Sequence, residues 1–239
     1  MIHEQVYGRR AVAETLRGPR EVSELWATER ALRAEAWLRE EAALRVQVRP
    51  ERALTAAAGT PDHQGVLAYC EPYRYADAHE LAAVDRPLIA CLDRVTDPRN
   101  LGAVCRSAEG AGATGLVLPA HGSAQVTPVV CRASAGAVEH LAVAVVTNLA
   151  RYLAEIKGAE LWVWAASAES GTSLWEADLA GGVVLVFGAE GRGIRPLVRR
   201  ACDGAVSIPL AGRVESLNVS VAAALLLYEA RRQRVFVPK

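Results

Sequence analysis

The sequence predicts an α/β protein in which a small N-terminal α/β domain precedes a larger domain built on a parallel sheet. Short apolar runs alternate with helical patterns along the 239 residues. From Pro87 onward these runs are apolar throughout, which is typical of parallel strands covered on both faces. Apolar residues make up 51% of the chain, enough for a sizeable core.

The N-terminal region alternates between helix and strand and ends near residue 72. The expected elements are a helix over 8–17, a strand within 21–28, a charged helix over 30–43, a strand over 45–48, a helix over 51–58 and a strand over 65–70. The next stretch, 71–87, mixes prolines with charges as linkers do. We therefore expect a domain over 1–75, a linker over 76–86 and a second domain over 87–239.

The second domain carries strand-like runs with helical patterns between most of them. The runs cover 88–93, 115–119, 141–146, 160–166, 183–188 and 205–210. Sheets of this class bind ligands outside the carboxyl ends of their strands. Polar residues that directly follow a strand are therefore candidates for a functional site.

A final helix is expected over 217–231. From Val219 to Tyr228 every residue except Ser220 is apolar, which predicts a helix buried on all sides. Its polar entry, with Ser216 and Asn218, suits a polar or anionic ligand at the positive end of the helix. The same residues also suit a core helix with an ordinary Ser or Asn cap.

Composition narrows the functional classes. The charges balance, with 27 basic and 27 acidic residues, and only the C-terminal 50 residues are basic enough to hint at a polyanion. The five cysteines and five histidines are scattered, which indicates reduced core cysteines and no metal site. No apolar run approaches the length of a membrane span, and the polar start MIHEQVYGRR lacks a signal-peptide core. We expect a cytoplasmic protein.

Two glycine-rich stretches have different contexts. Gly110, Gly112 and Gly115 match the G-x-G-x-x-G pattern of nicotinamide-dependent oxidoreductases, but they follow an expected helix and precede a strand, the wrong order for a dinucleotide site. Residues 188–193, GAEGRG, directly follow a strand, and their glycines let the backbone approach a ligand. Glu190 has no packing role among them, which makes it a candidate site residue.

Three strand ends carry unusual polar residues, namely 93–100, 188–193 and 210–218. Because the carboxyl ends of parallel strands meet at one edge of a sheet, we expect these three loops to converge.

These stretches resemble the three motifs of the SpoU (TrmH-type) RNA ribose 2′-O-methyltransferases of the SPOUT class. They read DRVTDPRNLGAVCRSAEGAG (93–112), LVFGAEGRGI (185–194) and SIPLAGRVESLNVSVAAALLLYEARRQR (207–234). VYGRRAVAETL (6–16) and HQGVLA (63–68) resemble the bacterial subgroup that methylates a guanosine in 23S ribosomal RNA. The resemblance implies S-adenosylmethionine bound in a deep C-terminal trefoil knot, and a homodimer whose partner helps to cover the last helix.

The resemblance also implies roles for individual residues. Positions near the chemistry correspond to Arg106, Asn100, Glu190, Ser216 and Asn218. Positions that contact the cofactor correspond to Gly188, Glu190, Gly191, Ile208, Leu210 and Leu217.

Physical chemistry limits these roles. A guanidinium stays protonated, so Arg106 suits a target phosphate and developing alkoxide charge better than proton removal. The alternative for Arg106 is a solvated helix face or an ion pair with Glu109. Glu190 could accept a proton or hold a loop amide. Asn100, which follows the turn at 97–99, could be a helix cap.

The N-terminal domain is expected to contact RNA. Residues 1–75 hold eleven basic and eleven acidic residues, so recognition would rest on shape and on local clusters such as Arg9 and Arg10. The alternative is a domain that only supports folding or dimerisation. Two further alternatives for the whole chain are the same chemistry on transfer RNA and a non-catalytic RNA-binding module in ribosome assembly.

Overall fold

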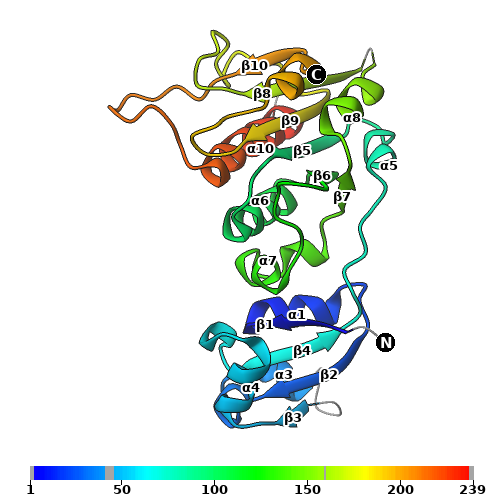
Figure 1. Ribbon diagram of the computed structural model, residues 1–239, viewed down its shortest axis with the longest axis vertical. Helices are drawn as coiled ribbons and strands as arrows, with labels where there is room; N and C mark the ends of the chain where they lie inside the picture. Colours follow the sequence, from blue (N-terminus) through cyan, green and yellow to red (C-terminus); the bar gives the residue numbers. More distant parts are fainter. Residues whose placement is uncertain (1–2, 41–45, 159, 237–239) are drawn as a thin grey trace. The chain divides into compact units, whose positions relative to one another are not determined.

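The computed structural model describes residues 3–40, 46–158 and 160–236 (Figure 1). The chain forms two compact units, one of residues 1–74 with 126–140 and the other of residues 75–125 with 141–239. The segment 126–140, which lies inside the expected second domain, therefore packs with the N-terminal residues.

The first unit is built on a four-stranded sheet in the order β1-β4-β2-β3. Strand β4 pairs antiparallel with β1 and β2, whereas β2 and β3 are parallel. The elements are β1 (Glu4–Tyr7), α1 (Arg9–Arg17), β2 (Val22–Ala27), α2 (Glu29–Ala34), α3 (Ala36–Glu40), β3 (Val46–Val48), α4 (Glu51–Ala58), the 3-10 turn η1 (Pro61–His63), β4 (Val66–Cys70), α7 (Pro128–Ala133) and the 3-10 turn η2 (Ala137–Glu139).

A buried ion pair holds the segment 126–140 in this unit. Arg20 and Glu139 are 5% and 6% exposed. The Nε of Arg20 donates to Glu139 Oε2 at 2.9 Å, and its Nη2 donates to Glu139 Oε1. Thr15 Oγ1 also donates to Glu139 Oε1, at 3.1 Å. The carboxylate from η2 is thus satisfied by groups from the N-terminal part of the unit.

The helix expected over 30–43 is divided in two. Glu35 lies between α2 and α3 in an extended conformation, with φ −112° and ψ 110°. Its carboxylate accepts from Arg9 Nη1 at 2.9 Å and from Trp37 Nε1 at 3.0 Å. These bonds hold the side chain at the break between the helices. The end of the expected helix, 41–43, and Arg45 of the expected strand lie outside the described residues.

The second unit is an α/β layer structure. Its six strands are all parallel and have the order β10-β8-β9-β5-β6-β7. The elements are α5 (Ala78–Ala82), β5 (Leu88–Asp93), α6 (Pro98–Gly110), β6 (Gly115–Pro119), β7 (Val143–Val146), α8 (Leu149–Ile156), β8 (Leu161–Ala166), β9 (Gly182–Gly188), α9 (Pro196–Ala201), β10 (Gly204–Val206) and α10 (Val219–Phe236).

Helices cover both faces of this sheet. Helices α8 and α9 pack on one face, where Tyr152, Leu153 and Val198 join a cluster with inward residues of the strands. Helix α10, red in Figure 1, packs against α6 and against β5 and β9. The continuous apolar runs follow from this double cover, and the expectation of a parallel α/β sheet is confirmed.

The expected linker and the last expected strand both differ in the structure. The expected linker contains the short helix α5, whose N-cap Asp77 accepts from His79 N at 2.7 Å. Strand β10 ends at Val206 rather than at 210, and after the bridge between Ser207 and Ser173 the chain leaves the sheet as a long loop to α10. Pro209 in this loop has no N–H for a ladder.

Helix α10 is not buried on all sides within the chain. Val221, Leu225 and Tyr228 are 46%, 41% and 52% exposed. The helix packs on the sheet and on α6 through its other side, where Ala223, Leu226 and Leu227 are fully buried. One chain therefore covers only one side of this helix, and the expectation that a partner subunit covers the rest stays a prediction.

The scattered cysteines and the first glycine pattern are structural. All five cysteines are buried and free, and burial raises the pKa of the Cys70 and Cys202 thiols to about 11. Gly110 ends α6 and Gly115 begins β6, so the pattern lies between a helix and a following strand, as expected for a turn. Among the described helices, none is both long and apolar enough to cross a membrane.

Candidate functional site

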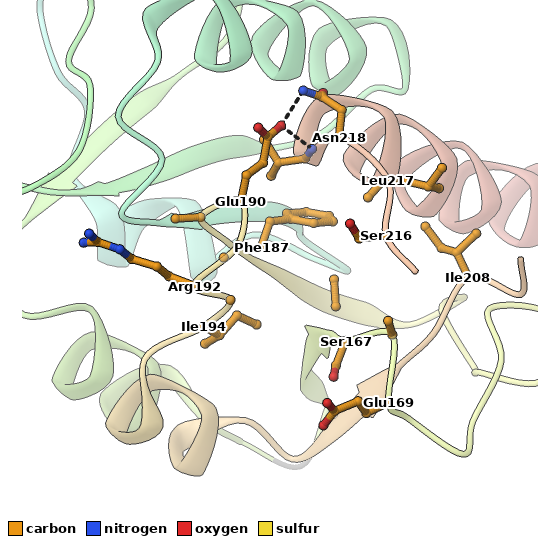
Figure 2. Close-up of a pocket in the computed structure, with 18 of the residues that line it drawn as sticks. Ser167, Glu169, Phe187, Glu190, Arg192, Ile194, Ile208, Ser216, Leu217 and Asn218 are labelled. Atoms are coloured by element: carbon orange, nitrogen blue, oxygen red, sulfur yellow. Dashed lines mark hydrogen bonds between the residues drawn. The ribbon is translucent and has the colours of Figure 1, made fainter. Parts of the chain in front are cut away.

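A cavity of about 870 Å³ opens at the carboxyl ends of β8, β9 and β10 in the second unit (Figure 2). Its walls are formed by residues 166–169 at the end of β8, 187–194 at the end of β9 and Arg199 of α9. The rest of the wall comes from the segment that runs from the end of β10 into α10, namely Val206, Ile208, Leu210, Ser216, Leu217, Asn218, Val219 and Ala222. Two of the three loops expected to converge therefore line this cavity, and the third contacts two lining residues, Glu190 and Asn218, through Asn100.

The end of β9 brings bare backbone to the cavity. A Cβ on Gly188 would lie 2.2 Å from the carbonyl carbon of Gly193 and 2.4 Å from the nitrogen of Ile194, so the loop folds directly against this residue. Gly191 and Gly193 have φ values of +72° and +63°, which glycine adopts without strain. Gly193 N donates to Ala189 O at 2.8 Å and closes the turn.

Three polar side chains from separate motifs meet beside this loop. The Oε1 of Glu190 accepts from the amides of Asn218 and Asn100, the latter at 3.4 Å. It also accepts from Val219 N at 3.4 Å, and Asn218 Nδ2 donates to Asn100 Oδ1 at 3.1 Å. Figure 2 shows Glu190 and Asn218 pointing toward each other at one end of the cavity. This cluster joins β9, α6 and α10.

Asn218 is also the cap of α10, as its position predicted. Its Oδ1 accepts from Ser220 N at 2.9 Å and from Ser220 Oγ at 2.6 Å. Asn100 is not a cap. Asp97 is the N-cap of α6 and accepts from Arg99 N at 2.8 Å, because its side chain lies just before Pro98 while Asn100 is already inside the helix.

The other predicted cofactor positions line the same cavity. Ile208 and Leu217 are half-buried, whereas Leu210 and Gly191 are exposed. Ser216, expected near the chemistry, is also exposed in this wall. Figure 2 shows Ile208, Leu217 and the buried Phe187 forming the apolar part of the wall, with Ser216 between them. An apolar wall with bare backbone beside it suits a flat heterocycle that also needs main-chain hydrogen bonds.

Sequence reasoning missed the loop after β8. Ser167 and Glu169 lie in the cavity wall, away from Glu190 and Asn218 in Figure 2. Arg192 and Arg199 also line the cavity. The signal was present, since the run over 160–166 ends at the same sheet edge as the other strands.

The structure does not bring Arg106 into the cavity wall. Arg106 is exposed on α6 and lies six residues beyond Asn100, or about 9 Å along the helix axis. In the first unit, Arg9 forms an ion pair with Glu35 at 2.9 Å, and Arg10 is exposed. Among the described residues, no group of three His, Cys, Asp or Glu is placed to hold a metal ion.

Comparisons with known proteins match both units. The model of the SpoU rRNA methylase family matches residues 87–228, and a model described as RNA 2′-O ribose methyltransferase substrate binding matches residues 5–76. The 23S rRNA (guanosine-2′-O-)-methyltransferase RlmB of Pseudomonas putida is 41% identical over 240 residues, 97% of each chain. RlmB of Xanthomonas campestris is 46% identical over 189 residues, 77% of this chain and 76% of that one.

A solved structure agrees with these sequence matches. The SpoU methyltransferase AviRb of Streptomyces viridochromogenes, crystallised in complex with the cofactor AdoMet, superposes with a TM-score of 0.83 at 26% identity. The superposition covers 98% of this chain and 91% of that chain.

Proposed function

This chain belongs to the SpoU rRNA methylase family, and from this premise we propose that it transfers a methyl group from S-adenosylmethionine to the ribose 2′-hydroxyl of a guanosine in 23S ribosomal RNA. One observation carries the proposal: the three family motifs meet at a single cavity, through the cluster of Asn100, Glu190 and Asn218. The names of relatives matched over nearly their full length support the choice of RNA.

The cavity fits the cofactor. Its volume of about 870 Å³ lies within the range of roughly 300–1,000 Å³ typical of small-molecule sites. Gly188 lines the cavity without a side chain, because the backbone of Gly193 and Ile194 occupies the place that a Cβ would need. Ile208 and Leu217 offer an apolar wall to an adenine ring, and Glu169 and Arg199 offer charges to the polar groups of the ligand. When bound, S-adenosylmethionine supplies an electrophilic methyl group and its own leaving group.

Glu190 serves best as a positioning group. The Oε1 of its carboxylate accepts from two side-chain amides and one backbone N–H. These contacts of Glu190 thus hold residues 188–193, the glycine loop, against the entry to α10. Proton removal from the ribose hydroxyl is not assigned to it.

Arg106 has an electrostatic role in this proposal. A guanidinium cannot act as a base near neutral pH, but it can bind a phosphate through two N–H groups and stabilise charge on a forming alkoxide. The exposed position of Arg106 on α6 leaves its guanidinium available to RNA. We assign it to the target nucleotide rather than to the cofactor.

We also propose that the second unit carries the trefoil knot of the family and that two copies pair through α10. The knot is supported by the order of the last elements, since the long loop after β10 returns the chain to α10 beside β5 and β9. Pairing is supported by the exposed apolar side chains of Val221, Leu225 and Tyr228, which a second copy would cover. The first unit, with the exposed Arg10, is proposed to hold the RNA, and the substrate-binding family match supports this role.

Transfer of labelled methyl groups in vitro tests the proposal. The purified protein is incubated with S-adenosylmethionine and either transcribed 23S ribosomal RNA or a transfer RNA pool. We expect label in the 23S RNA alone, and digestion should locate it on the ribose of one guanosine. Label in transfer RNA alone would favour the transfer-RNA alternative, and no label in either, despite cofactor binding, would favour a non-catalytic module.

A further inference from the structure

A buried carboxylate lies just behind the cavity wall. Asp93 is the last residue of β5 and is fully buried. In the parallel register of the sheet it stands beside Gly188, the last residue of β9. A buried carboxylate is stable only when hydrogen bonds or a counter-charge replace its water.

Asp93 receives these bonds from Arg195, at the far end of the glycine loop. Arg195 N donates to Asp93 Oδ2 at 2.8 Å, and Arg195 Nε donates to Oδ1 at 2.8 Å. The Nη2 of Arg195 also lies 2.7 Å from Oδ1. Charge-assisted contacts of this kind are directional and strong. The pair therefore fixes both the backbone and the side chain at position 195.

The pair closes the base of the loop that lines the cavity. The loop leaves the sheet at Gly188, turns through the bridge between Ala189 and Gly193, and ends at Arg195, the N-cap residue of α9. Its start is on β9, and its end is attached to the neighbouring strand β5 through Asp93. The loop is thus held at its base by this pair and at Glu190 by the two asparagines.

Neither member of the pair lines the cavity, whereas Ile194, the residue before Arg195, does. We propose that Asp93 and Arg195 are positioning residues for the glycine loop. They act on methyl transfer through the placement of residues 188–194 rather than through contact with a ligand. This inference rests on the proposed function for the identity of the cofactor, but the placement of the loop can be measured without any ligand.

The test uses Arg195→Gln and Asp93→Asn, which keep side-chain size and remove the ion pair. Arg195→Lys keeps the charge but not the two-pronged contact. The matched control is Lys157→Gln, which removes another ion pair of this unit, Lys157 with Asp203 at 2.6 Å. That pair lies at the amino ends of the strands, away from the cavity at their carboxyl ends. Asp203 precedes β10, and its carboxylate also accepts from Val163 N near the start of β8.

The first measurement is amide hydrogen exchange in the cofactor-free protein. We expect amides of 189–195 to exchange at least about tenfold faster in Arg195→Gln and Asp93→Asn than in the parent, because the base of the loop opens locally. Arg195→Lys should lie between them and the parent. In Lys157→Gln these amides should exchange at the parental rate.

The second measurement separates positioning from general stability. In steady-state methyl transfer, Arg195→Gln should raise the KM for S-adenosylmethionine roughly tenfold, while kcat at saturating cofactor and the KM for RNA stay within a few-fold. Parental exchange of 189–195, or a cofactor KM within twofold of the parent, would overturn the inference and leave the pair as a stability element. A parent that methylates no RNA would refute the proposed function, and the exchange result would still decide the placement of the loop.

Discussion

At the scale of single residues, Arg106 carries the most specific prediction. If its guanidinium holds the target phosphate and the forming alkoxide, Arg106→Ala should slow single-turnover methyl transfer by roughly two to three orders of magnitude, as loss of a preorganised charge-stabilising donor does. Cofactor affinity should stay within a few-fold, since Arg106 is outside the cavity wall. Arg106→Lys should recover little of the rate, because an ammonium cannot make a planar two-pronged contact.

The control for Arg106 is Arg99→Ala, which removes another exposed arginine of the same helix. We expect this variant to keep most of the parental rate. An Arg106→Ala variant with a near-parental rate would end the catalytic assignment.

Gly188 gives the matching prediction for the cofactor. In Gly188→Ala the new Cβ would lie 2.2 Å from the Gly193 carbonyl carbon, so the loop must move by an amount on the order of 1 Å, enough to spoil aligned hydrogen bonds. Calorimetry should show cofactor affinity reduced roughly tenfold or more. Gly181→Ala is the control, because Gly181 precedes β9 and has no atom within 4 Å of its Cβ position. Equal affinities for the two variants would contradict this cofactor site.

Much of the site could be predicted at this scale. Glu190, Asn218 and Asn100 come from stretches 28 or more residues apart, yet each follows a strand end or opens a helix, and the geometry of a parallel sheet brings such positions together. The bonds among them could not be predicted, because a polar residue near a helix start can cap or bind. Asn100 shows this ambiguity, since Asp97 is the cap instead.

At the scale of elements, periodicity and composition identify strands and helices better than their ends. Strand β9 matches its apolar run closely, because both faces of the sheet are covered. Strand β10 is shorter than its run, since the chain leaves the sheet after Ser207 to line the cavity. The exposed side of α10 was not visible in the sequence, because an all-apolar helix does not reveal which neighbours cover it.

The segment around α7 and η2 gives a prediction at this scale. Removing one member of a buried ion pair leaves an uncompensated charge, so Arg20→Ala should reduce the free energy of unfolding by about 3–5 kcal/mol. Arg74→Ala removes the exposed pair with Glu71, at 2.9 Å, and should cost no more than about 1 kcal/mol. Urea titrations of both variants compare the two. A loss below about 1 kcal/mol for Arg20→Ala would show that this pair does not hold the segment in place.

At the scale of the whole molecule, the exposed side of α10 predicts self-association. Sedimentation at micromolar concentration should show a particle of twice the 25.5 kDa chain mass. Leu225→Glu should shift it toward the monomer, because the substitution would place a charge inside an apolar interface. Leu197→Glu, at a 68% exposed apolar residue on α9, is the control and should remain a dimer. A monomeric parent would refute pairing through this helix.

The RNA that the whole chain modifies can be identified most directly by one measurement in cells. Ribose 2′-O-methylation is mapped across ribosomal and transfer RNA from a strain that lacks this chain, and from the same strain carrying the parental protein or Arg106→Ala. We predict that one guanosine of 23S ribosomal RNA loses its 2′-O-methyl group in the deletion strain and that only the parental protein restores it. An unchanged 23S map would contradict the account, whether or not a methyl group is lost from transfer RNA.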